Sequence, residues 1–181
     1  MKKLAVFILA PLFVITTLGF SGNANPDKGN LDPNNTLVEF KTHLVPFHTE
    51  IDYRSPLEQL DENGVINIFS SGIGTATHMG LVKMEIYEIV DTHGFDPNEW
   101  DADADVVLTA ANGDELHFSY TSTIDPADFF NGSGNLYIVG ACIVTGGTGR
   151  FSEASGTLIY TGVHNVYTST GTVDFDGTIM Y

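Results

Sequence analysis

The sequence predicts an all-β fold: a single eight-stranded antiparallel β-barrel, with a two-sheet β-sandwich as the alternative. From residue 36 onward, no stretch of ten or more residues repeats its apolar positions with the 3.6-residue period of a helix. Short runs rich in Val, Ile, Thr, Tyr and Phe are instead separated by Gly, Asn and Asp, which is typical of strands joined by tight turns. Eight or more strands without covering helices must hide their edges, and closing the sheet into a barrel achieves this.

The N-terminus has the pattern of an export signal. Lys2 and Lys3 precede an apolar stretch over 4–20, and small residues follow, ending at Ala24. We expect cleavage after Ala24, so that 1–24 is a signal peptide and the mature protein is secreted or periplasmic, with no stable membrane insertion. The alternative is a retained anchor, although the apolar stretch is shorter than the ~20 residues that span a bilayer.

The composition bounds the domain count and the partners. The chain has 181 residues, of which 43% are hydrophobic, which suits one domain with a core. It carries 23 acidic and 7 basic residues, a net charge of −16, and removing the two lysines of the signal makes this −18. Nucleic acids and anionic membrane surfaces are therefore excluded as partners. A single cysteine, Cys142, rules out an internal disulfide, and its apolar surroundings predict a buried, inert thiol.

The segment 25–35 has a linker composition, with two prolines and almost no apolar residues. The folded domain is therefore expected over 36–181. The strand candidates, in chain order, are 36–44, 48–53, 64–70, 73–79, 81–90, 104–111, 115–123, 135–145, 155–163 and 171–180.

The strongest local signal is a hairpin at Asn112-Gly113. This dipeptide tolerates the positive φ angles of a two-residue turn, so the strands on either side are expected to pair antiparallel. In the second of these strands Leu116, Phe118 and Tyr120 alternate with polar residues. One face of that strand is thus predicted to point into a core.

The acidic segment 96–105 is predicted to be a loop between strands. Asp101, Asp103 and Asp105 would converge on a calcium ion if the backbone turned sharply there. The alternative is a solvated acidic loop, with Trp100 covering the end of the barrel.

Signatures of catalysis and cofactor binding are absent from the sequence. Six histidines, at 43, 48, 78, 93, 117 and 164, include no pair with metal-ligand spacing. Ser70, Ser71 and Gly72 fall between two predicted strands rather than before a helix, so they form no nucleophile elbow. No dinucleotide or phosphate-loop motif is complete, and no cofactor is predicted.

Three ordered segments carry a family resemblance. The first is Gly-Gly-Thr-Gly-Arg-Phe at 146–151, followed by Gly156; its glycines permit a tight turn, and Phe151 is placed to plug a barrel end. The other two are Gly-Ile-Gly-Thr-Ala-Thr-His-Met-Gly at 72–80 and Ala-Ala-Asn-Gly-Asp at 110–114. Together they resemble segments of the calycin-like allene oxide cyclase and dirigent barrels, in their secreted bacterial branch.

The resemblance implies an eight-stranded barrel and several alternative roles. The first expectation is an exported barrel that binds a small apolar molecule in its interior or at its mouth. The second is an isomerase or cyclase of the allene oxide cyclase type, for which His78, Glu115 and His117 are the candidate ionisable groups. The third is a structural or assembly barrel that forms homo-oligomers. Arg150 is either an anchor for a carboxylate ligand or part of an ion pair that holds its turn.

Overall fold

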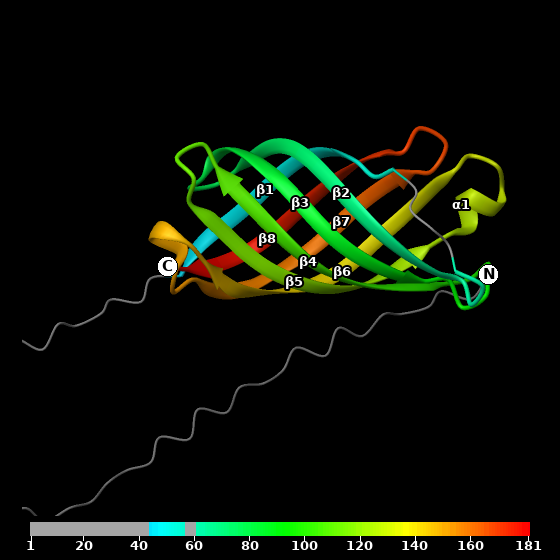
Figure 1. Cartoon of the computed structure of the whole chain (residues 1–181). Helices are drawn as coiled ribbons and strands as arrows, with labels where there is room; N and C mark the ends of the chain where they lie inside the picture. Colours follow the sequence, from blue (N-terminus) through cyan, green and yellow to red (C-terminus); the bar gives the residue numbers. More distant parts are fainter. Residues whose placement is uncertain (1–43, 57–60) are drawn as a thin grey trace, which may run out of the picture. The chain divides into compact units, whose positions relative to one another are not determined.

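The computed structural model describes residues 44–56 and 61–181, and in these residues eight strands form one closed antiparallel barrel (Figure 1). Each strand pairs with its neighbours along the chain, and β1 pairs with β8 to close the sheet. The predicted barrel is confirmed, and the sandwich alternative is wrong. The strands are β1 (Val45–Arg54), β2 (Val65–Ala76), β3 (Gly80–Asp91), β4 (Trp100–Ala110), β5 (Glu115–Asp125), β6 (Asn135–Gly147), β7 (Ser155–Asn165) and β8 (Thr170–Met180).

The predicted signal peptide, linker and cleavage site at Ala24 lie outside the described residues. So does the first predicted strand apart from Leu44, which precedes β1 and is not in a strand.

The predicted hairpin and its inward face are confirmed. Asn112 and Gly113 lie in the turn between β4 and β5, and Gly113 has a φ of 89°. Leu116, Phe118 and Tyr120 are almost completely buried. Alternate residues of each strand therefore form the interior of the barrel, as the two-residue period of a strand requires.

Two predicted strands, 64–70 and 73–79, are in fact the single strand β2. Gly72 lies in the middle of β2 and pairs with Tyr53 of β1 and Met84 of β3. A Cβ at position 72 would lie 2.6 Å from the carbonyl oxygen of Asp52. This glycine thus allows β1 and β2 to approach closely, whereas the sequence pattern suggested that it broke a strand.

The end of the acidic segment is also a strand rather than a loop. Residues 100–105 begin β4, and Asp103 pairs with Ile89 of β3 and Thr121 of β5. The alternation has a structural reason, because Ala102 and Ala104 are buried inside while the intervening aspartates point outward. A spacing of one acid at every second position is thus the ordinary pattern of a strand with one exposed face.

Two short helices mark the two ends of the barrel. The helix α1 (Ala127–Phe130), which the sequence pattern did not predict, connects β5 to β6. The 3-10 helix Gly149–Phe151 lies at the opposite end, near the C-terminus (Figure 1). Phe151 is fully buried there, and its ring centroid is 4.8 Å from that of Tyr181, which confirms its predicted place as a plug. We call these the α1 end and the Phe151 end.

Candidate functional site

The interior of the barrel is hollow at the α1 end. A cavity of about 390 Å³ opens there, within the range of pockets that bind small molecules. Most of its wall is apolar, and the polar exceptions are Ser55, Glu88, His164 and two tyrosine hydroxyls. The lining residues are Tyr53, Ser55, Ile66, Ile68, Glu88, Val90, Phe95, Trp100, Ile124, Phe129, Leu136, Ile138, His164, Val166 and Tyr167.

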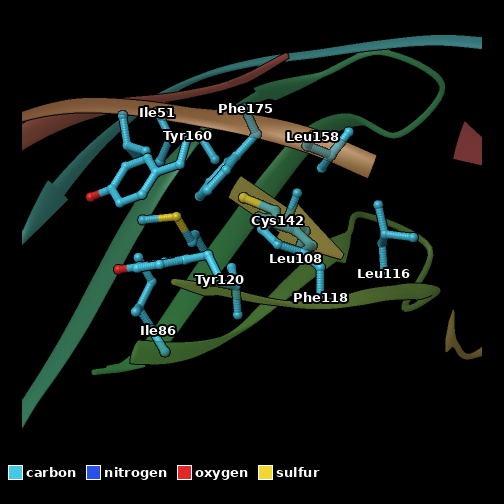
Figure 2. Packing of buried hydrophobic residues seen from close by; sticks show 14 of the residues in the cluster. Ile51, Ile86, Leu108, Leu116, Phe118, Tyr120, Cys142, Leu158, Tyr160 and Phe175 are labelled. Carbon is cyan, nitrogen blue, oxygen red and sulfur yellow. The ribbon is translucent and has the colours of Figure 1, made fainter. Parts of the chain in front are cut away.

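A packed layer of aromatic rings lies in the core of the barrel (Figure 2). None of its rings lines the cavity, and we call this layer the aromatic floor because it lies deeper in the barrel than the cavity. The ring centroids of Phe118 and Phe175 are 4.7 Å apart, and those of Tyr160 and Phe175 are 5.2 Å apart. Tyr120 packs beside Tyr160 with a centroid separation of 4.6 Å. Leu108 belongs to the same buried cluster as these rings. Side chains therefore fill the barrel between the aromatic layer and the Phe151 end.

Glu88 is a carboxylic acid on the inward face of β3. It follows Met84 and Ile86 in the inward alternation of that strand and lines the cavity. The hydroxyl of Tyr120 donates a hydrogen bond to Glu88 Oε1 at 2.7 Å. Burial raises the pKa of Glu88 above its ordinary value, while the hydrogen bond from Tyr120 acts in the opposite direction.

The three interior tyrosines are neutral hydroxyl groups. Burial raises the pKa of Tyr53, Tyr120 and Tyr160, and the nearby carboxylate of Glu88 raises them further. The hydroxyls of Tyr120 and Tyr160 point to the same side of the packed layer, away from Leu158 (Figure 2). Since His164 lies four residues beyond Tyr160 on β7 and lines the cavity, this is the cavity side.

His164 is the second ionisable group on the cavity wall. Its ring stacks on Tyr53, with centroids 5.7 Å apart and planes 19° apart, and the residue is 7% exposed. Its Nδ1 is buried without a hydrogen-bond partner among the described residues. Burial lowers the pKa of His164, so its imidazole is neutral at neutral pH.

Aromatic side chains surround the mouth of the cavity. Trp100 is buried at the start of β4, and its Nε1 donates a hydrogen bond to the carbonyl oxygen of Asp96 at 2.7 Å. The rings of Phe95 and Phe129 contact Trp100 edge-on, with centroids 6.2 and 5.9 Å away. The expected position of Trp100 at a barrel end is confirmed.

Two residues singled out from the sequence, His78 and Arg150, lie together at the Phe151 end, away from this cavity. Arg150 Nη2 donates a hydrogen bond to the carbonyl oxygen of His78, and Arg150 Nε lies 3.7 Å from Asp114 Oδ2. The guanidinium also stacks over Phe151, 4.8 Å from the ring centroid. His78 Nε2 is 3.0 Å from the carbonyl oxygen of Pro46. These contacts correspond to the ion-pair alternative for Arg150, with Asp114 as the acid.

Glu115 and His117 point outward from β5. His117 Nε2 is 2.9 Å from Glu115 Oε2, and each side chain keeps more than a third of its surface exposed. Neither residue lines the cavity at the α1 end. These two ionisable groups, which the sequence singled out, thus lie side by side in the structure, but on the outer surface of the barrel.

Asp101, Asp103 and Asp105 project from the outer face of β4. Because the strand is extended, successive outward residues are separated by about 6.5 Å along it. The sharp turn that would bring three carboxylates together is not formed. Asp101 instead pairs with His93, at 3.0 Å between His93 Nε2 and Asp101 Oδ2. Nowhere in residues 44–56 and 61–181 does a group of three or more His, Cys, Asp or Glu side chains converge to hold a metal ion.

Sequence reasoning missed Glu88, although a signal for it exists. In β3 the buried residues Val82, Met84, Ile86 and Val90 alternate with exposed ones, and Glu88 lies in phase with the buried set. Apolar residues such as Ile89 also occur on the outer face of β3, which obscured the phase of the alternation.

The prediction that the Cys142 thiol is buried is confirmed, because Cys142 is 1% exposed and burial raises its pKa to about 12.

Comparisons of the chain with protein-family models, with curated proteins and with solved structures found no match. The resemblance to allene oxide cyclase and dirigent barrels therefore stays a prediction from three sequence segments. Among the helices of the described residues, none has the length and apolar character needed to span a bilayer.

Proposed function

We propose that this protein binds a small, mainly apolar molecule in the cavity at the α1 end of the barrel, after export from the cytoplasm. The observation that carries the proposal is the cavity itself, which has a volume of about 390 Å³ and a largely apolar wall. An apolar molecule that enters it removes both its own surface and the cavity wall from water, which favours binding.

The test uses N-phenyl-1-naphthylamine, an uncharged apolar dye whose fluorescence rises in apolar surroundings. We expect saturable binding to the purified protein. Ile138 lines the cavity, whereas its neighbour Val139 is 59% exposed on the outer face of β6. Ile138→Trp fills the cavity and should weaken dye binding at least about tenfold, while Val139→Trp should leave it unchanged.

The proposal is wrong if the wild-type protein does not bind the dye, or if the two tryptophan variants bind it equally well. Circular dichroism establishes that each variant is folded. Leu136→Phe, which adds less volume to the cavity wall, replaces Ile138→Trp if that variant does not fold.

A second candidate function, an isomerase that works by proton transfer, is favoured by one observation. Glu88 has a raised pKa, accepts a hydrogen bond from Tyr120 and lines an apolar cavity, which is the environment of a general acid or base. The candidate group is thus Glu88 rather than His78, Glu115 or His117. Exchange of deuterium from solvent into a bound ketone, lost in Glu88→Gln, would support it; equal exchange in both proteins would discard it.

A further inference from the structure

Among the described residues, the interior of the barrel holds one carboxylate, that of Glu88, and no Lys or Arg side chain. The described residues contain three Lys and Arg side chains: Arg54 and Lys83 point outward, and Arg150 lies at the Phe151 end. None of them lines the cavity. Within the part of the chain that the structure describes, a charged ligand in the cavity therefore meets the acid Glu88 and no Lys or Arg that would compensate its charge.

Glu88 has a free position for a ligand. Within the described part of the chain it accepts one hydrogen bond, from Tyr120 to Oε1, and its side chain forms part of the cavity wall. A carboxylate has two oxygens and about four acceptor positions, so a donor on the ligand has room beside the hydrogen bond from Tyr120. In the low dielectric of the interior, an opposite charge at this position is attracted much more strongly than in water.

The rest of the wall suits a cation with an apolar body. The rings of Tyr53, Phe95, Trp100, Phe129 and Tyr167 line the cavity. Aromatic faces attract organic cations, and tryptophan attracts them most strongly. The formal net charge of −16 also raises the concentration of cations near the protein and speeds their association.

The same features disfavour an anionic ligand. A carboxylate placed beside Glu88 would lose its hydration and meet a like charge, and both effects oppose binding. An uncharged ligand of the same shape fills the cavity but gains no ion pair.

We propose that the natural ligand is a hydrophobic amine, in which a protonated nitrogen pairs with Glu88 and an aromatic or aliphatic body fills the cavity. This inference rests on the proposed function, since it names the class of molecule that the same cavity takes.

Three probes with one indole body separate the effect of charge from the effect of shape. Tryptamine is a cation near neutral pH, tryptophol is uncharged and indole-3-acetate is an anion. Isothermal titration calorimetry with each should show that tryptamine binds at least about tenfold more tightly than tryptophol, and that indole-3-acetate binds most weakly.

Glu88→Gln removes the charge and keeps the shape and the acceptor for Tyr120, so it should abolish the preference for tryptamine. The matched control is Glu85→Gln, because Glu85 is an exposed acid on the outer face of the same strand. That control should retain the preference. The proposal is overturned if tryptophol binds as tightly as tryptamine to the wild-type protein, or if Glu88→Gln keeps the preference.

The wild-type protein gives a second, independent readout, which stands even if Glu88→Gln does not fold. Tryptamine affinity should rise as the pH rises above about 4.3, the ordinary glutamate pKa, because Glu88, whose pKa is raised by burial, ionises while the amine stays protonated. Among the other ionisable groups of the interior, the tyrosines and the thiol stay neutral because burial raises their pKa, and burial lowers the pKa of the histidine, which favours its neutral form. They are Tyr53 on β1, Tyr120 on β5, Cys142 on β6, and Tyr160 and His164 on β7. A flat pH profile overturns the proposal.

The apolar dye separates the two proposals. If the uncharged dye binds in the cavity and the protein binds tryptamine no more tightly than tryptophol, the cavity binds apolar molecules but is not selective for amines. If the dye does not bind and tryptamine binding does not depend on Glu88, the proposed function fails as well.

Discussion

Replacing Phe175 with alanine tests whether the aromatic floor is solidly packed, which is what confines the cavity to the α1 end. Phe175 has 0% of its surface exposed and contacts the rings of Phe118 and Tyr160 at centroid distances of 4.7 and 5.2 Å. Buried Phe-to-Ala substitutions lower the free energy of unfolding by about 3–5 kcal/mol. We expect about 4 kcal/mol here, because hydrogen-bonded strands surround the site and resist collapse into the space left.

This loss corresponds to a fall in melting temperature of roughly 8–16 °C for a domain of this size. Urea denaturation followed by circular dichroism measures the change in free energy, with an unchanged m-value as the sign of two-state unfolding. A double-mutant cycle with Phe118→Ala should give a coupling energy of about 0.5–1.5 kcal/mol for the aromatic pair. The control is Ile159→Ala: Ile159 is 58% exposed, and its loss should change stability by less than about 0.5 kcal/mol. A loss below about 1 kcal/mol for Phe175→Ala would refute the packed floor.

Three further substitutions, and the addition of calcium, test other parts of the molecule. Glu88→Gln should stabilise the protein increasingly, relative to the wild type, as the pH rises above about 4.3, the ordinary glutamate pKa. Because the pKa of Glu88 is raised in the folded state, the folded protein holds this proton more tightly than the unfolded chain, and the contribution of Glu88 to wild-type stability falls as the pH rises. Parallel stability curves for the two proteins would contradict this. Gly149→Ala should cost about 1–2 kcal/mol in urea denaturation, because Gly149 has a φ of 55°, and no loss would contradict that backbone assignment. Arg150→Met should lower the free energy of unfolding by less than about 1 kcal/mol, since the ion pair of Arg150 is largely exposed. The same variant should still bind the dye, and a loss of dye binding would place the ligand at the Phe151 end instead. Millimolar calcium should leave the melting temperature unchanged, because the β4 aspartates do not converge; a clear rise would revive that site.

Local patterns predicted the strands and several of their details. Asn112-Gly113 marked a hairpin because its turn requires positive φ angles, and the alternation through Leu116 and Phe118 gave the inward face of β5. Gly72 was misread, since a glycine in a sequence signals either a turn or a close approach of strands, and only the position of β1 distinguishes them. Asp101 and Asp103 were assigned to a loop although they lie in β4, because an alternation of acids fits both an ion-binding turn and an exposed strand face.

The sequence by itself determined that the chain is all-β, that it is strongly acidic and that Cys142 is buried, since these follow from composition and from the two-residue period of strands. Only the tertiary structure decided which ionisable groups share the interior. Glu88, Tyr120 and His164 come from three different strands, and their meeting depends on the register of the closed barrel. Turn geometry and the inward pattern set the register of each consecutive pair of strands, but these three residues lie on strands that are not paired with one another, so their approach inside the barrel also depends on how β1 and β8 close the sheet.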